Sequence, residues 1–311
     1  MTQSALASRP GSRVLVIFPG ALGDLICFAP ALRAIARRHP AATLELMARA
    51  ELARFAAPRL GVARGHSIDR REMSLLFIGD GTRRPEVSAF FGAFDRTYSF
   101  FAASDQRFRA SLAAASENTV SFHPFRPPGG GHVAACYLRA IGEEPPASLA
   151  PRIEVSRGDI ESAAPVLERL GLAPHRFVLL FPGSGTPAKN WPLEKFRALA
   201  RELEAHLPAL FVLGPAESML EIDLCGRGLR TVSGLQLSEA AALASLARGF
   251  AGNDSGVSHL AAAAGAPGVV LFGPTDPVRW RPLGRVEVIW RAALANLTVA
   301  EVADSAVRLL V

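Results

Sequence analysis

Glycine-rich loops place two charged side chains where they could do chemistry. Asp24 follows the turn 19–23 at the predicted start of a helix, where a carboxylate could take a proton from a substrate hydroxyl as a general base. The alternative is an ordinary helix cap, and the sequence favours neither role. Lys189 lies in the loop 182–190 and is one of only two lysines in a chain with 32 arginines. A lysine retained in such a chain is typical of a crowded phosphate site, which a compact ammonium group fits better than a guanidinium group.

A third loop, 252–259, reads GNDSGVSH and leads into an alanine-rich predicted helix. The free amide groups and the positive dipole end of such a helix could hold a phosphate or a diphosphate. The alternative is that Asp254 or Ser255 only caps the helix, and both roles can hold together. In doubly wound sheets, ligands bind beyond the carboxyl ends of the strands, which is where this loop and the loops 19–24, 182–190 and 214–217 are expected.

Two common nucleotide-binding signatures do not fit. A P-loop needs a glycine directly before its lysine, and neither Lys189 nor Lys195 follows a glycine. The stretch 183–188 matches a dinucleotide fingerprint, but the prolines at 187 and 192 delay the helix that this fingerprint requires. A nicotinamide-dependent enzyme is therefore a weak alternative.

The strands and helices that would position these loops alternate in both halves of the chain. In the first half, apolar runs at 13–18 and 43–47 predict strands around a helix that includes 25–36. In the second half, the strand 177–181 and the helix 192–207 repeat this pattern. Further elements are expected as helices at 51–57, 216–225, 238–247 and 256–264 and as strands at 209–213, 231–232, 249–251, 268–272 and 286–289. The sequence therefore predicts an α/β protein of two Rossmann-like halves with mostly parallel sheets.

The predicted boundary between the two halves lies near 143–156, where three prolines cluster. We therefore assign residues 1–150 and 151–295 to the two domains. The amphipathic segment 296–311 is expected to form a closing helix that crosses back onto the first domain. The segment 73–128 shows the least regular pattern of the chain.

Positive charge is concentrated in the first half. Residues 1–150 hold 18 arginines against 12 acidic residues, whereas residues 151–311 hold 14 arginines and two lysines against 16 acidic residues. This asymmetry indicates an anionic partner, either a membrane surface or an acidic substrate, or else an arginine-rich surface facing water. No cluster of basic and aromatic residues favours nucleic acid, so we expect no nucleic-acid partner.

Other features of the composition bear on compartment, metals and packing. No apolar run is long enough to span a bilayer and no secretory signal is visible, so a cytoplasmic protein is expected. The three cysteines lack metal or redox spacing and are expected to be buried, reduced thiols. The chain has no Asp-x-Asp pair and no His/Cys cluster with ligand spacing, so no metal site is expected. Trp191 and Trp280 are expected to pack beside their proline neighbours rather than to bind sugar.

Three separated motifs resemble one family of proteins. The stretches 14–24, 181–192 and 252–263, the last followed by 271–277, are similar to glycosyltransferase family 9, whose best-known members are the ADP-heptose:lipopolysaccharide heptosyltransferases. The resemblance implies a GT-B fold, in which two Rossmann domains face each other across a cleft. It places the acceptor on the N-terminal domain and the nucleotide-sugar on the C-terminal domain.

The resemblance also implies roles for single residues. Asp24 would be the catalytic base, with Gly20 and Gly23 beside it on the acceptor side. Lys189 would contact the donor phosphates, and Glu217 would contact the nucleotide ribose. Further donor-side residues would be Gly183, Ser184, Gly185, Thr186, Asp254, Ser255, Gly256, Ser258 and His259.

The function expected from these residues is an inverting, metal-independent transfer of a sugar. The favoured donor is ADP-heptose, and the favoured acceptor is a hydroxyl of lipopolysaccharide core or of another anionic glycan. No cofactor is expected, because the nucleotide-sugar is a substrate. Attachment to the inner face of the cytoplasmic membrane through the basic half is an open alternative to a purely cytoplasmic protein, and the oligomeric state is left open. Two other functions remain: an epimerase of nucleotide sugars, for which His259 and Glu217 are the candidate residues, and a non-catalytic sugar-nucleotide-binding protein.

Overall fold

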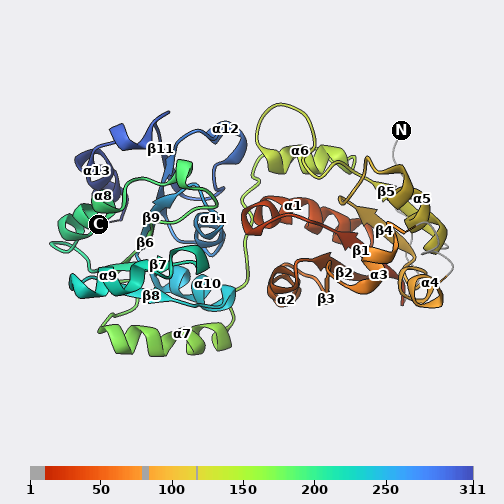
Figure 1. Ribbon diagram of the computed structural model, residues 1–311, viewed down its shortest axis with the longest axis horizontal. Coiled ribbons are helices and arrows are strands. Elements are labelled where there is room, and N and C mark those ends of the chain that lie inside the picture. The colour runs from red at the N-terminus through yellow and green to blue at the C-terminus, as the bar shows by residue number, and fades with distance from the viewer. Residues whose placement is uncertain (1–10, 79–83, 117, 311) are drawn as a thin grey trace. The chain divides into compact units, whose positions relative to one another are not determined.

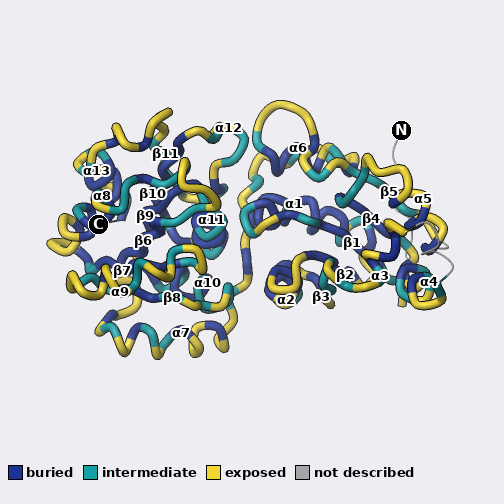
Figure 2. Tube along the Cα trace, in the orientation of Figure 1, coloured by how far each residue is buried: buried dark blue, intermediate teal, exposed yellow. Residues whose placement is uncertain are grey.

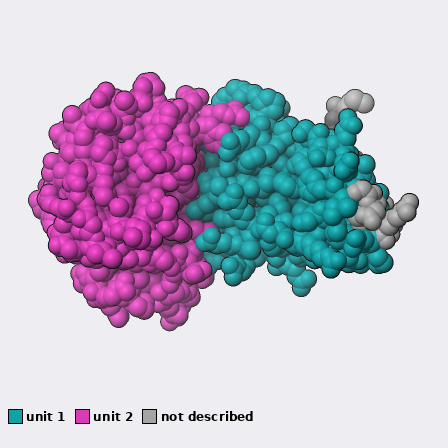
Figure 3. All heavy atoms as spheres, viewed as in Figure 1, with its two compact units in different colours: residues 1–149 teal, residues 150–311 magenta. Residues whose placement is uncertain are grey.

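The chain folds into two compact units, Met1–Leu149 and Ala150–Val311, which Figure 3 colours separately. The computed structural model describes residues 11–78, 84–116 and 118–310. Each unit has its own sheet, in which all the strand pairs are parallel. The central strands are buried and the loops that join the elements carry most of the exposed residues (Figure 2). This burial explains why the central strands read as continuous apolar runs in the sequence.

The first unit contains a five-stranded sheet in the order β3-β2-β1-β4-β5 (Figure 1). The order places β1 at the centre, so the loop that follows β1 emerges from the middle of the carboxyl edge. The elements are β1 (Arg13–Ile17), α1 (Leu22–Arg38), β2 (Thr43–Ala48), α2 (Ala50–Arg59), β3 (Arg64–Ser67), α3 (Arg71–Leu75), α4 (Pro85–Phe91), β4 (Arg96–Ser99), α5 (Gln106–Ala115), β5 (Thr119–Phe122) and α6 (Val133–Ala140).

The segment 73–128 is more regular than its sequence indicates. It contains α4, β4, α5 and β5, and β4 pairs directly with β1. Strands β4 and β5 are only four residues long and include polar residues, so they lack the apolar run that marks the other strands. Aromatic residues of this segment, among them Phe91, Phe94 and Phe108, are fully buried in a core with Leu15 and Ile17 of β1.

One buried carboxylate links three strands of the first unit. Glu45 on β2 is 3% exposed and accepts a hydrogen bond from Arg13 Nε at 2.7 Å. His66 Nε2 on β3 lies 2.6 Å from the other oxygen of the same carboxylate. Burial alone would raise the pKa of Glu45, but the hydrogen bonds with Arg13 and His66 hold that pKa below its ordinary value.

The second unit contains a six-stranded sheet in the order β11-β10-β9-β6-β7-β8 (Figure 1). Strands β6 and β9 are neighbours with Phe181 opposite Gly252, so the loops that follow them start side by side. The elements are α7 (Arg157–Leu170), β6 (Val178–Phe181), η2 (Pro187–Lys189), α8 (Leu193–Leu203), β7 (Ala209–Leu213), η3 (Pro215–Glu217), α9 (Leu220–Gly226), β8 (Arg230–Ser233), α10 (Leu237–Leu246), β9 (Gly249–Asn253), α11 (Gly256–Ala263), β10 (Gly268–Phe272), α12 (Pro277–Trp280), β11 (Val286–Trp290), η4 (Leu294–Asn296) and α13 (Val299–Leu310).

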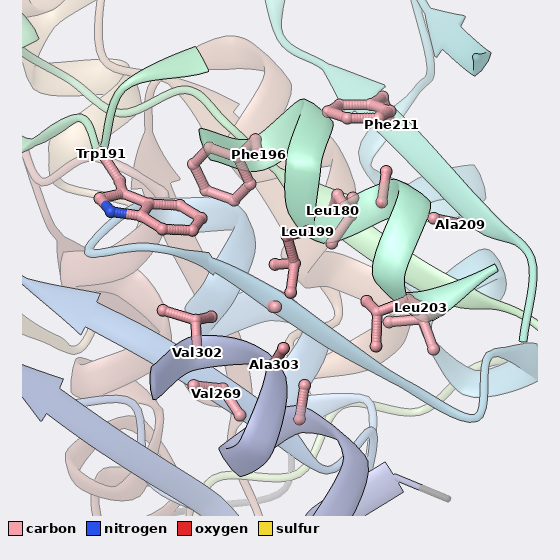
Figure 4. Close-up of a cluster of buried hydrophobic side chains, with 14 of the residues drawn as sticks. Leu180, Trp191, Phe196, Leu199, Leu203, Ala209, Phe211, Val269, Val302 and Ala303 are labelled. Atoms are coloured by element: carbon pink, nitrogen blue, oxygen red, sulfur yellow. The ribbon is translucent and has the colours of Figure 1, made fainter. Parts of the chain in front are cut away.

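Two separate cores lie on the two faces of this sheet. Alternate residues of the strands belong to different cores: Val178 and Leu180 of β6 pack with α8, α9 and α13, whereas Leu179 and Phe181 pack with α7, α10 and α11. This is the period-two alternation of a strand that is covered on both sides. The first of these cores includes Trp191, which is 1% exposed (Figure 4).

The closing helix α13 belongs to the second unit. We expected it to cross back onto the first domain, but its apolar face packs against α8 and β10 of its own unit. Val302, Ala303 and Ala306 are buried in the same core as Trp191. Figure 4 labels Val302 and Ala303. This face covers apolar strand residues of the second unit that would otherwise be exposed to water.

The cysteines are all free, but they are not all buried. Cys27 and Cys136 are buried, whereas Cys225 is exposed, with its Sγ 2.8 Å from Thr231 Oγ1. The prediction was wrong for Cys225 because α9 is a short surface helix that buries only Leu224. Among the described residues, no helix is both long and apolar enough to cross a membrane.

Candidate functional site

The turn after β1 holds Asp24 at the start of α1. A Cβ atom added to Gly20 would lie 2.4 Å from the Phe18 ring and 2.7 Å from Cβ of Asp24, so this tight turn requires glycine. Gly23 and Asp24 are the second and third residues of α1, and the backbone N–H of Ala21 donates to Asp24 Oδ2 at 3.2 Å. Asp24 therefore caps its helix through Oδ2, and its other carboxylate oxygen, Oδ1, takes no part in this cap.

That second oxygen is the reactive candidate in the first unit. Asp24 Oδ1 is buried and accepts no hydrogen bond from the described residues, and Nη2 of Arg126 lies 3.6 Å away. The ring of Phe18, which lies just before the turn, stacks on Phe28 at 4.4 Å between centroids. A carboxylate with one oxygen fixed by an amide and the other available could accept a proton from a bound hydroxyl.

Lys189 and Asp254 meet in the second unit. Nζ of Lys189 lies 2.7 Å from Oδ2 of Asp254, although 65 residues separate them. The Asp254 side chain is 6% exposed and that of Lys189 is 31% exposed. Since β6 and β9 are adjacent and parallel, their following loops bring the two residues together at the carboxyl edge of the sheet.

Asn253, which the sequence analysis missed, lies between these loops. Its side chain is fully buried, and its Nδ2 donates to the carbonyl of Pro182 at 2.7 Å. Its Oδ1 accepts a hydrogen bond from the backbone N–H of Trp191 at 3.0 Å. The available signal was an asparagine at the end of an otherwise apolar strand, where a buried amide needs partners.

The start of α11 is formed by Ser255 and Gly256. Ser255 is the N-cap, and its Oγ accepts a hydrogen bond from the backbone N–H of Ser258 at 3.4 Å. Ser258 is fully buried, and its hydroxyl donates to the carbonyl of Asn253 at 2.7 Å. His259 is also buried, at 6% exposed. Ser258 and His259 are thus buried residues of α11, whereas Ser255 and Gly256 form its N-terminal end, where the first amide groups lack partners within the helix.

Glu217 lies against Gly183, the first glycine of the loop 182–190. A Cβ atom added to Gly183 would lie 2.2 Å from Cδ of Glu217, so only glycine leaves room for this carboxylate. The backbone N–H of Glu217 donates to the carbonyl of Gly214 at 3.0 Å, which fixes the turn after β7. Burial raises the pKa of Glu217 above its ordinary value.

The remaining residues of this loop support it from within. The hydroxyl of Ser184 donates to the carbonyl of Thr186 at 2.7 Å, so Ser184 braces the turn. Gly185 and Thr186 are exposed and lie on the outer part of the loop. Within residues 11–78, 84–116 and 118–310, no group of three or more His, Cys, Asp or Glu side chains could hold a metal ion.

The two parallel α/β units have the architecture of the GT-B glycosyltransferase class. The sequence model of "Glycosyltransferase family 9 (heptosyltransferase)" matches residues 136–305, which is more than half of the chain. The chain therefore belongs to glycosyltransferase family 9. This match confirms the family that the motifs indicate, and it does not include Asp24.

Two curated relatives are heptosyltransferases. The chain is 34% identical over 124 residues to lipopolysaccharide heptosyltransferase 3 of Escherichia coli (strain K12), a match that covers 37% of this chain and 36% of that protein. It is 23% identical over 305 residues to lipopolysaccharide heptosyltransferase 2 of the same strain, covering 87% of this chain and 85% of that protein. The first match thus spans about a third of its relative's length.

Solved structures confirm the fold. A family 9 glycosyl transferase from Veillonella parvula DSM 2008 superposes with a TM-score of 0.81 at 20% identity, covering 98% of this chain and 99% of that chain. The E. coli ADP-heptose lps heptosyltransferase II superposes with a TM-score of 0.74 at 21% identity, covering 96% of this chain and 98% of that one. The predicted fold class, α/β with two parallel sheets, is therefore correct.

Proposed function

We propose that this protein transfers a sugar from a nucleoside-diphosphate donor, with ADP-heptose as the favoured donor, to a hydroxyl of an anionic glycan such as lipopolysaccharide core. The transfer inverts the anomeric carbon and needs no metal ion. Membership of family 9 and the names of the heptosyltransferase relatives support this choice. The observation that carries it is the ion pair of Lys189 with Asp254 at the N-terminal end of α11.

The donor side of the proposal follows from this ion pair. A lysine ammonium group has three N–H donors, and Asp254 takes one of them. The other two can meet oxygens of a diphosphate, and the free amide groups at the start of α11 add partial positive charge. Together they stabilise the negative charge that builds up on the diphosphate as it leaves.

The acceptor side of the proposal uses Asp24. The acceptor oxygen forms a bond to the anomeric carbon while the bond from that carbon to the diphosphate oxygen breaks. The hydroxyl proton passes to Asp24, whose Oδ1 accepts no hydrogen bond from the described residues, and the nucleoside diphosphate leaves. Attack from the face opposite the leaving group inverts the anomeric configuration.

Charge supports an anionic acceptor. The first half of the sequence, which we assign to the acceptor, holds 18 arginines against 12 acidic residues. An acceptor that carries phosphates or carboxylates would be attracted to this half, and the attraction would weaken with salt. We infer that the protein works in the cytoplasm, with the basic half turned toward an anionic membrane surface that presents the glycolipid.

The test is a transfer assay on the purified full chain. ADP-heptose is incubated with a lipopolysaccharide acceptor truncated before its heptose, in EDTA, and the product is followed by mass spectrometry and NMR. We expect the acceptor to gain one heptose with inverted anomeric configuration. Activity that disappears in EDTA and returns with a divalent cation would contradict metal independence.

The same assay separates the alternatives. Conversion of the nucleotide-sugar into an isomer without any acceptor would indicate an epimerase. Binding of ADP-heptose without turnover on any acceptor would indicate a sugar-nucleotide-binding protein. Either result would overturn the proposed transfer.

A further inference from the structure

We infer that Asn253 is a positioning residue for the donor diphosphate. Its carboxamide joins the two ends of the loop 182–190 and thereby holds Lys189 beside the N-terminus of α11. This inference rests on the proposed donor site, because the effect it predicts is on binding of a nucleoside diphosphate. It adds a residue that touches no part of the donor and acts through Lys189 and Asp254.

The geometry places one side chain at both ends of the loop. Nδ2 of Asn253 donates to the carbonyl of Pro182, the first loop residue, at 2.7 Å. Oδ1 of Asn253 accepts from the N–H of Trp191, the residue directly after the loop, at 3.0 Å. Asn253 is fully buried, so water does not compete for these bonds. The carboxamide therefore fixes the width of the base of the loop.

The far end of the loop is anchored independently in the core. The Trp191 indole is 1% exposed, and its Nε1 donates to the carbonyl of Leu297 at 3.0 Å. Its ring packs edge-on against Phe196 with centroids 5.0 Å apart (Figure 4). Trp191 is thus a fixed point of the second unit, and Asn253 ties the start of the loop to it.

Asn253 adjoins both members of the ion pair. Lys189 lies two residues before Trp191, and Asp254 directly follows Asn253 in the chain. In the structure, Nζ of Lys189 lies 2.7 Å from Oδ2 of Asp254. A change in the position of the Asn253 carboxamide would therefore move these two residues relative to one another. Lys189 would then no longer be held in position for a diphosphate, whereas the sheet would stay intact.

Asparagine suits this position because one end of the loop needs a hydrogen-bond donor and the other end needs an acceptor. The carbonyl of Pro182 needs a donor and the N–H of Trp191 needs an acceptor, and a carboxamide supplies both in one plane. An ionised aspartate could accept from Trp191 but could not donate to Pro182. Asn253→Asp therefore breaks one bond and Asn253→Ala breaks both.

The experiment is a double-mutant cycle in which dissociation constants for ADP and AMP are measured by calorimetry on the full chain. We expect Asn253→Ala to weaken ADP binding by about tenfold and AMP binding by much less, because the lost contact is to the second phosphate. In a Lys189→Ala background the same change should cost less than about threefold, because Lys189 is the residue it positions. Asn253→Asp serves in its place where Asn253→Ala does not fold.

Leu167→Ala is the matched control. Leu167 on α7 is 5% exposed in the same unit but belongs to the core on the other face from Trp191. Its truncation should lower stability without changing the ADP dissociation constant by more than about twofold. The inference would be overturned if Asn253→Ala bound ADP as tightly as the wild type does. It would also be overturned if Asn253→Ala weakened ADP binding by the same factor in the Lys189→Ala background as in the wild type.

Failure of the proposed function is recognised separately. A wild-type protein that does not bind ADP more tightly than AMP would contradict the proposed donor class. Hydrogen exchange would then still test whether Asn253 holds the loop 182–190. The amides of residues 183–186 and 188–190 should exchange faster in Asn253→Ala than in Leu167→Ala when both are compared at equal global stability. Equal exchange in the two variants would show that Asn253 does not hold the loop.

Discussion

Nζ of Lys189 lies 2.7 Å from Oδ2 of Asp254, and this pair joins the loop after β6 to the start of α11. Asp254 is buried, and its backbone N–H donates to the carbonyl of Leu271 on the neighbouring strand at 3.0 Å. The backbone of Asp254 is therefore fixed by the sheet, and its carboxylate orients a lysine whose side chain is partly exposed. A cation held in place in this way costs little reorganisation when a diphosphate arrives.

Removal of Lys189 should weaken the response to the nucleotide. We expect ADP at about 100 times its wild-type dissociation constant to stabilise the wild type by about 2.7 kcal/mol and Lys189→Ala by much less in a thermal-unfolding assay. Turnover of Lys189→Ala should fall about 10²- to 10³-fold, because one charge-stabilising contact is lost.

The other lysine of the chain gives the control. Lys195 Nζ donates to the carbonyls of Ala295 and Leu297 at 2.6 and 2.7 Å, so it fastens α8 to the segment before α13. Lys195→Ala should lower the melting temperature and keep the full response to ADP. An equal loss of response in both variants would refute a specific role for Lys189.

Enlarging Gly183 should weaken nucleotide binding through Glu217. The methyl group of Gly183→Ala would overlap the Glu217 carboxylate, with only 2.2 Å to its Cδ, and must push this side chain aside. We expect a loss of ADP affinity of about tenfold with little change in the melting temperature, because the side chain can move aside but would then lose the ribose contact proposed for it.

Whether the methyl group acts through Glu217 is checked by comparing two proteins. One is the single variant Glu217→Ala, and the other is the double variant that carries both Gly183→Ala and Glu217→Ala. Once the carboxylate is absent, the added methyl group has nothing to displace. The single and double variants should then bind ADP equally, as measured by calorimetry. A further loss in the double variant would mean that the methyl group meets the nucleotide itself.

Most of the fold follows from local sequence patterns, whereas two details of the site do not. The strands 178–181 and 268–272 are apolar because both faces of the sheet are covered, so their sequence marks them directly. The pairing of Lys189 with Asp254 depends on strand order, which local patterns do not contain. The same holds for Asn253, whose partners Pro182 and Trp191 lie 71 and 62 residues away.

Two elements were misjudged for different reasons. Amphipathicity indicates that helix α13 has a buried face but not which sheet receives it. Strand β4 was missed because it is four residues long and includes polar residues, although it pairs with β1. Helix α13 packs against α8, and strand β4 pairs with β1. Long-range packing of this kind can be read only once the sheets are known.

Neutralising Glu45 should destabilise the first unit. Glu45 is 3% exposed, so Glu45→Gln leaves the guanidinium of Arg13, whose side chain is 32% exposed, without its counter-charge. We expect the free energy of unfolding at pH 7 to fall by about 2 kcal/mol, as for the loss of a hydrogen bond between charged groups. The three tryptophans lie in the second unit, so the measurement is hydrogen exchange of the β1 and β2 amides rather than fluorescence.

The pH dependence of this effect has a defined sign. The pKa of Glu45 is lowered in the folded state, so its contribution is complete above the ordinary value of 4.5 and is lost as the pH falls through the lowered one. The stabilities of wild type and Glu45→Gln should therefore converge in acid. Glu51→Gln, at an exposed position on α2, should match the wild type at every pH; a parallel offset between wild type and Glu45→Gln down to pH 2 would contradict the account.

Replacing Asp24 should separate chemistry from donor binding. Asp24→Asn keeps an oxygen to accept from the N–H of Ala21, so the start of α1 should remain folded. It removes the proton acceptor, and we expect turnover to fall about 10²- to 10⁴-fold. The ADP dissociation constant should stay within about twofold of the wild-type value, because the loops proposed to bind the donor belong to the other unit.

Arg126→Ala is the control for charge near Asp24. Its Nη2 lies 3.6 Å from Asp24 Oδ1 and its side chain is 57% exposed, so the pair is a weak one. Arg126→Ala should raise the KM for an anionic acceptor more than it lowers kcat, whereas Asp24→Asn should lower kcat at an unchanged KM. Because a base acts on the bound acceptor, an Asp24→Asn protein that turns over at the wild-type rate would require another group to take the proton.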